Sequence, residues 1–180
     1  ESMRLYSGKI PVIAEEIVDY EPDLTVTHVT TPTYLFDKAF TETLRRRLPD
    51  TFMALVGTHV SAVGASTLDD FPVDALIVGE GEETIDEIAA RLDARVKGNA
   101  PSAVSDAIAG LWIRNGDGTA HYTGDRNAHR ELDDFPLPAR DLLPVKNYMM
   151  PFFPGEPFVT IISNRGCPVP CIFCSAGAVW

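Results

Sequence analysis

Three cysteines near the carboxyl end of the chain are the residues best suited to chemistry. Cys167, Cys171 and Cys174 have the spacing C-x3-C-x2-C, and the 180-residue chain has no other cysteine. An odd, crowded set makes a poor disulfide framework, so a metal is the better explanation. Thiolates are the ligands of iron–sulfur clusters, and three of them can hold three irons of a cubane while the fourth stays open. An open metal position can take a substrate or a cofactor, as it does at catalytic zinc.

Two other interpretations of the cysteines stay open at this point. The thiolates could bind zinc with a fourth ligand from elsewhere, or they could be inert or oxidised thiols. The preceding sequence favours the iron–sulfur cluster, because residues 158–163 (FVTIIS) predict a strand that leads to the first cysteine. Gly166 lets the backbone turn sharply off this strand, and Pro168 and Pro170 stiffen the loop.

Residues 160–174 resemble the first strand and cluster loop of the radical S-adenosylmethionine (SAM) superfamily. The resemblance implies a [4Fe-4S] cluster on the three cysteines, whose open iron is chelated by SAM. One-electron reduction then cleaves SAM to a 5′-deoxyadenosyl radical. Phe173 matches the family's aromatic residue before the last cysteine and is a candidate cofactor contact. A small-molecule substrate and an electron donor such as flavodoxin or ferredoxin are also implied.

Three earlier segments narrow the resemblance to one branch of the superfamily. They are residues 56–59 (VGTH), 73–84 (VDALIVGEGEET) and 132–141 (LDDFPLPARD). Together with the cysteine motif they resemble the cobalamin-binding radical SAM enzymes, in which a B12-type α/β domain precedes the radical SAM barrel. The resemblance covers roughly residue 15 to the end of the chain.

The elements that must position these residues alternate between helix and strand. Apolar runs predict strands at 24–29, 52–56 and 75–78, and helical spacing of apolar residues predicts helices near 13–18, 36–48 and 82–96. Strands separated by helices imply parallel pairing in an α/β fold. Three strands are too few for a finished sheet, so we expect an incomplete doubly wound, flavodoxin- or Rossmann-like B12-binding domain whose first β-α-β unit lies outside the chain.

The sequence predicts three parts. Residues 1–97 form the B12-binding-like domain. Residues 98–157 form a small linker with a hairpin at Asn-Gly-Asp-Gly (115–118) and a proline-rich extended connector. Residues 158–180 begin a truncated radical SAM (β/α) barrel. Since six residues follow Cys174 and such a barrel needs ~250 residues, the chain by itself is expected to be catalytically silent.

Loops at the carboxyl ends of the predicted strands are the candidate cobalamin site, because ligands of open parallel sheets bind there. Glycines let backbone approach a large flat cofactor, and threonine hydroxyls can bond its amides and nucleotide tail. A plain turn is the alternative for each loop. The candidate cofactor-binding residues are Thr30, Thr31, Thr33, Gly57, Thr58, His59, Gly79, Glu80 and Gly81.

Histidines and glutamates near these loops are expected to have structural roles rather than to bind cobalt or act in catalysis. His59 is not expected to ligate cobalt, because the Asp-x-His-x-x-Gly loop of other B12 proteins is absent. His28 lies inside a predicted strand and is expected to be structural. Glu80, Glu82 and Glu83 fit a solvated helix start.

Charge and hydropathy exclude other classes of partner. The chain has 15 Lys and Arg against 26 Asp and Glu, a net charge of −11, so a basic face for nucleic acid or anionic membrane is not expected. No apolar run approaches the ~18 residues of a membrane helix, so no membrane insertion is expected. No basic-then-apolar leader opens the chain, which favours a cytoplasmic location.

The predicted function is reductive cleavage of SAM at a [4Fe-4S] cluster, with cobalamin on the sheet between the two domains. The family that this chain resembles mostly transfers methyl groups to unactivated carbon or phosphorus. Radical cyclisation, as in the anaerobic magnesium-protoporphyrin monomethyl ester cyclases, is an alternative. A non-catalytic B12-like binding module with a structural three-cysteine metal site is another.

Overall fold

The computed structural model describes residues 10–97, 107–127, 131–149, 152, 155–169, 171–174 and 177. The chain divides into two compact units. One comprises Glu1–Arg126 with Cys167–Trp180, and the other comprises Asn127–Gly166.

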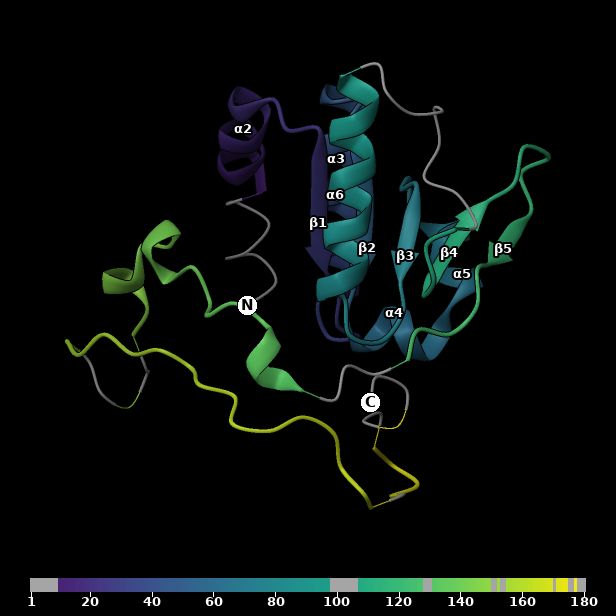
Figure 1. Cartoon of the computed structure of the whole chain (residues 1–180). Helices are drawn as coiled ribbons and strands as arrows, with labels where there is room; N and C mark the ends of the chain where they lie inside the picture. Colours follow the sequence, from purple (N-terminus) through teal and green to yellow (C-terminus); the bar gives the residue numbers. More distant parts are fainter. Residues whose placement is uncertain are drawn as a thin grey trace. The chain divides into compact units, whose positions relative to one another are not determined.

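The first unit contains a five-stranded sheet in the order β1-β2-β3-β4-β5 (Figure 1). Strands β1, β2 and β3 pair in parallel, whereas β4 is antiparallel to β3 and β5 is antiparallel to β4. The prediction of a parallel α/β sheet is therefore confirmed. The elements in chain order are α2 (Ile10–Tyr20), β1 (Leu24–His28), α3 (Tyr34–Arg47), β2 (Phe52–Val56), α4 (Thr58–Val63), α5 (Ala65–Asp70), β3 (Ala75–Ile77), α6 (Glu82–Val96), β4 (Leu111–Arg114) and β5 (Ala120–Tyr122).

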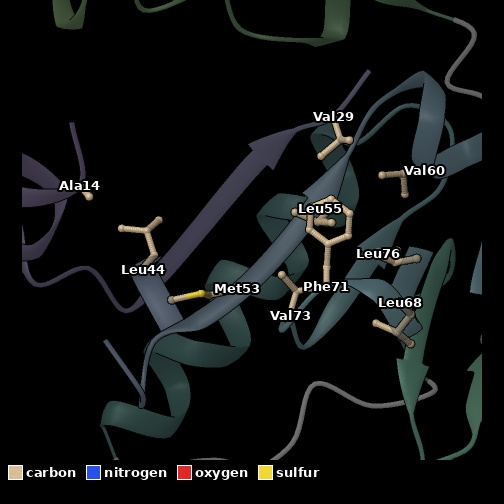
Figure 2. Close-up of a cluster of buried hydrophobic side chains, with 10 residues drawn as sticks. All are labelled: Ala14, Val29, Leu44, Met53, Leu55, Val60, Leu68, Phe71, Val73 and Leu76. Carbon is tan, nitrogen blue, oxygen red and sulfur yellow. The ribbon is translucent and has the colours of Figure 1, made fainter. Parts of the chain in front are cut away.

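Buried side chains cover both faces of the sheet, as in a doubly wound fold. Side chains alternate between the faces of a strand, so Met53 and Leu55 lie in one cluster and Ala54 in the other. Figure 2 shows the first cluster, to which α2, α3, α4 and α5 contribute. Its members are Ala14, Val29, Leu44, Met53, Leu55, Val60, Leu68, Phe71, Val73 and Leu76. Helix α6 packs on the other face, where the buried residues are Ala54, Ala75, Ile77, Ile88, Ile108, Leu111 and Ile113.

The structure corrects the prediction for residues 58–122 in two respects. Helices α4 and α5 were not predicted, because six residues each are too few to establish a helical period. The hairpin, predicted inside a linker, is part of the sheet. Its strand β4 pairs with β3, and Leu111 and Ile113 are buried on the α6 face. The domain boundaries at 97 and 157 stay a prediction.

Arg45 of α3 links the segments that enter β2 and β3. Its Nε donates a hydrogen bond to the Pro72 carbonyl at 2.9 Å, and its Nη1 donates to the Thr51 carbonyl at 3.0 Å. Its Nη2 donates to Asp74 Oδ2 at 2.6 Å, and the same carboxylate oxygen accepts the backbone N–H of Met53 at 2.7 Å. One carboxylate thus satisfies two donors from different elements.

We expect Asp74→Ala to lower the free energy of unfolding by about 2 kcal/mol, because Arg45 Nη2 and the Met53 N–H lose the carboxylate that both donate to. Asp93→Ala is the matched control. It removes an ion pair with Lys97 at 2.7 Å whose side chains are 62% and 61% exposed, so the loss should stay below about 0.5 kcal/mol. Urea denaturation measures both values, and equal losses would contradict the special role of Asp74.

The second unit consists of short turns. It holds the 3-10 helices Leu132–Asp134, Arg140–Leu142 and Val145–Asn147, and a β-bridge between Met149 and Pro157. The strand predicted at 158–163 is not formed, and these residues are exposed. A strand is held by hydrogen bonds to a neighbouring strand, and in the described part of this unit only the Met149–Pro157 bridge provides any pairing. Among the described residues, no helix has the length and apolar character needed to cross a bilayer.

Candidate functional site

The loops that follow β1, β2 and β3 meet at the carboxyl edge of the parallel strands. His28, the last residue of β1, is paired with Val56 of β2, and Val56 is paired with Ile77 of β3. Figure 1 shows this edge at the lower end of the sheet, where α4 lies. The structure therefore gathers the predicted loops of residues 30–33, 57–59 and 79–81 at one edge.

The threonines after β1 form a closed turn. Thr33 N–H donates to the Thr30 carbonyl at 3.1 Å, and the two hydroxyl oxygens lie 2.9 Å apart. Thr33 Oγ1 also donates to Asp37 Oδ2 at 2.6 Å. Burial raises the pKa of the Asp37 carboxyl, while the Thr33 hydrogen bond and the His28 charge act in the opposite direction. Because Thr30 and Thr33 already bond within the turn, Thr31 is the member whose hydroxyl contacts another loop.

Two glycines at this edge are closely packed. Gly57 has φ +125° and ψ 179°, a region almost confined to glycine. A Cβ atom there would lie 2.5 Å from the Val29 carbonyl oxygen, so the end of β1 packs directly on the glycine. A Cβ at Gly81 would lie 3.1 Å from Val56 Cγ2.

Gly79 joins the β3 loop to α4. Its φ is +78°, and its N–H donates to Ser61 Oγ at 3.0 Å. Ser61 was not a predicted site residue. Its only sequence signal is a hydroxyl one helical turn after the Gly57-Thr58 loop.

His59 is held by one residue of the loop after β1 and one residue of α3. Its Nδ1 lies 3.0 Å from Thr31 Oγ1, and its ring is tilted by 55° against the Tyr34 ring at 4.7 Å between centroids. Tyr34 donates a hydrogen bond to Asp70. Burial, and then this hydrogen bond, raises the pKa of Tyr34 to about 12. Tyr34 was missed because no local pattern places its ring beside a histidine 25 positions later.

The acidic start of α6 is only partly solvated. Thr58 is exposed and Glu80 is half-buried at the edge. Glu83, predicted to be a solvated helix-start residue, instead pairs with Arg126 Nη1 at 3.3 Å. Arg126 Nη2 lies 2.9 Å from Glu87 Oε1. These contacts tie the segment after the hairpin to α6.

The cysteine motif lies on an exposed turn. None of the three cysteines forms a disulfide; Cys167 and Cys174 are exposed and Cys171 is half-buried. Cys174 N–H donates to the Cys171 carbonyl at 3.1 Å, and Gly166 has φ +80°, as the predicted sharp turn requires. Phe173 is 89% exposed.

The cysteine side chains are not assembled into a site. In the described part of the chain, no three His, Cys, Asp or Glu side chains converge to hold a metal. Thiol groups of a metal loop come together when the metal binds and their protons are released. Three thiols within one short loop fit a thiolate-ligated cluster by their chemistry.

Comparison with known proteins finds methyltransferases that resemble the chain in sequence. No family model matches the chain. It is 30% identical over 166 residues, or 91% of its length, to "Uncharacterized methyltransferase PH0819" of Pyrococcus horikoshii. It is 33% identical over 140 residues, or 75% of its length, to the hopanoid C-3 methylase of Methylococcus capsulatus.

Solved structures support the same assignment at the level of the fold. The radical SAM methyltransferase TsrM from Kitasatospora setae, with cobalamin and a [4Fe-4S] cluster bound, matches 62% of this chain with a TM-score of 0.51 and 17% identity. TsrM with tryptophan and a SAM analogue matches 63% with a TM-score of 0.53 and 18% identity. The chain therefore shares its fold with part of a cobalamin-binding radical SAM methyltransferase. The family resemblance stated from the sequence is thus confirmed.

The chain spans a limited part of the length of the proteins that it matches. The chain covers 34% of PH0819 and 24% of the hopanoid C-3 methylase. It covers 21% of the TsrM chain. The likeness to TsrM concerns the fold, so the roles of individual residues rest on their own chemistry.

Proposed function

We propose that the full-length protein is a cobalamin-dependent radical SAM methyltransferase. The observation that carries the proposal is the presence, in one chain, of a C-x3-C-x2-C motif and of a parallel sheet edge built from glycines and threonines. The relatives support methyl transfer, because PH0819, the hopanoid C-3 methylase and the cytidylyl-2-hydroxyethylphosphonate methyltransferase of Streptomyces wedmorensis carry methyltransferase names.

The chain would contribute ligands and surfaces to this reaction. Cys167, Cys171 and Cys174 would ligate three irons of a [4Fe-4S] cluster and leave the fourth iron open to SAM. Phe173, exposed beside Cys174, would offer an aromatic surface to the bound SAM. When bound, the cluster would supply the electron that cleaves SAM, and cobalamin would carry the methyl group.

The carboxyl edge of the sheet would hold the cobalamin. Gly57, Gly79 and Gly81 lack side chains that would separate the corrin ring from the backbone. Thr58 presents an exposed hydroxyl-bearing side chain, which can bond the amides of the ring. An electron donor such as flavodoxin and a cytoplasmic location stay predictions.

Anaerobic reconstitution of the full-length protein with iron and sulfide tests the proposal. We expect iron and sulfide uptake with a brown charge-transfer absorbance, binding of hydroxocobalamin, and 5′-deoxyadenosine after addition of SAM and dithionite. Reconstitution with zinc in place of iron is the control. Stoichiometric zinc uptake with no iron uptake and no SAM cleavage would replace the enzyme with a non-catalytic B12-like binding module.

A further inference from the structure

His59, at the carboxyl edge, is held both by a hydrogen bond from the loop after β1 and by a ring contact from the start of α3. Thr31 Oγ1 lies 3.0 Å from Nδ1, and Tyr34 packs on the ring at 4.7 Å. Tyr34 is itself held by Asp70 and by an edge contact with the buried Phe71 at 5.1 Å. The imidazole is thus connected to the core of the first unit although it is only half-buried.

The two nitrogens of this imidazole are not equivalent. The contact between Thr31 Oγ1 and Nδ1 fits either tautomer of the ring, and in the tautomer in which the Thr31 hydroxyl donates, the hydrogen of neutral His59 lies on Nε2. Among the described residues, Nε2 has no hydrogen-bond partner, whereas Nδ1 has one. A histidine held through one nitrogen presents the other with a defined orientation, which is how proteins orient histidines toward ligands.

We infer that Thr31 donates to Nδ1 and that His59 Nε2–H donates a hydrogen bond to an oxygen acceptor of the corrinoid, either an amide carbonyl of its ring substituents or its nucleotide phosphate. The inference rests on the proposed function, because it needs a corrinoid at the carboxyl edge. It gives His59 a role other than cobalt ligand. Thr31 and Tyr34 are then positioning residues, which act on the ligand through His59.

Two substitutions distinguish a His59 that contacts the ligand from a His59 that only stabilises the loops. In His59→Gln, the side-chain amide reaches the place of Nε2 and keeps a donor there, but it loses the acceptor for Thr31. In His59→Asn, the shorter amide keeps an acceptor near Nδ1 for Thr31 and loses the distal donor. Hydroxocobalamin affinity is measured by equilibrium titration in the full-length protein, and the melting temperature is measured without cobalamin.

We expect His59→Asn to bind hydroxocobalamin about tenfold more weakly than wild type, the value of one hydrogen bond. We expect His59→Gln to stay within about threefold of wild type. In the opposite result, His59→Asn keeps its affinity, whereas His59→Gln loses affinity and has a lower melting temperature. That result would mean that His59 only stabilises the loops, and it would overturn the inference. His121→Gln, on β5 at the far edge of the sheet, is the control and should bind as wild type.

Cobinamide, which keeps the amide substituents but lacks the nucleotide loop, distinguishes the two acceptors. If wild type and His59→Asn still differ tenfold in their affinity for cobinamide, the acceptor is an amide carbonyl. If this difference in affinity disappears, the acceptor is the nucleotide phosphate. A changed visible spectrum of the bound cobalt in His59→Gln at unchanged affinity would make His59 a cobalt ligand and overturn the inference. Failure of wild type to bind any corrinoid would count against the proposed function itself, whereas equal binding by wild type and both variants overturns only the role of His59.

Discussion

Cys171→Ala is expected to abolish cluster assembly and SAM cleavage in the full-length protein. Two thiolates remain in the loop, and a cluster that relies on three protein ligands loses an iron attachment. Iron content after anaerobic reconstitution should fall from about four per chain to background, and 5′-deoxyadenosine should fall below detection. Metal analysis and chromatography measure the two quantities on the same sample.

Val169→Ala is the matched control for the cysteine variant. Val169 lies between Cys167 and Cys171 in the sequence and is 58% exposed, so its truncation changes the loop without removing a ligand. It should keep wild-type iron content. A Cys171→Ala protein that still assembles the cluster and cleaves SAM would show that the three cysteines are not its ligands.

Gly57→Ala is expected to lower the free energy of unfolding by about 3 kcal/mol. Its backbone conformation, with φ +125°, costs a residue with a side chain about 1–3 kcal/mol. The added Cβ would also lie 2.5 Å from the Val29 carbonyl oxygen, and this oxygen belongs to backbone that can move only with the end of β1. Urea denaturation measures the change.

The same substitution should weaken hydroxocobalamin binding, because relief of the contact displaces the loops after β1 and β2. Gly116→Ala is the control, since a Cβ there has no atom within 4 Å. It should change stability by less than about 0.5 kcal/mol and leave cobalamin affinity unchanged. Equal stability of the two variants would mean that the β2–α4 loop tolerates a side chain.

Local patterns in the sequence determined the strands and the chemistry of the cysteine loop. The apolar runs at 52–56 and 75–78 correspond to β2 and β3. They could be predicted because a strand buried on both faces is a continuous apolar run of only a few residues. The cysteine spacing and the turn at Gly166 are likewise contained in one short segment. These signals were sufficient to indicate the family.

Only the tertiary structure decided which distant residues meet. The hairpin joins the sheet because the unpaired edge of β3 accepts β4, a choice that its Asn-Gly-Asp-Gly turn does not encode. Thr31 and His59 lie 28 positions apart, and Arg45 and Asp74 lie 29 apart. The first contact depends on parallel strands that bring two loops to the carboxyl edge, and the second depends on α3 packing beside the segment that enters β3. The run at 158–163 has the local pattern of a strand but forms none, because a strand also needs a neighbour with which to exchange hydrogen bonds.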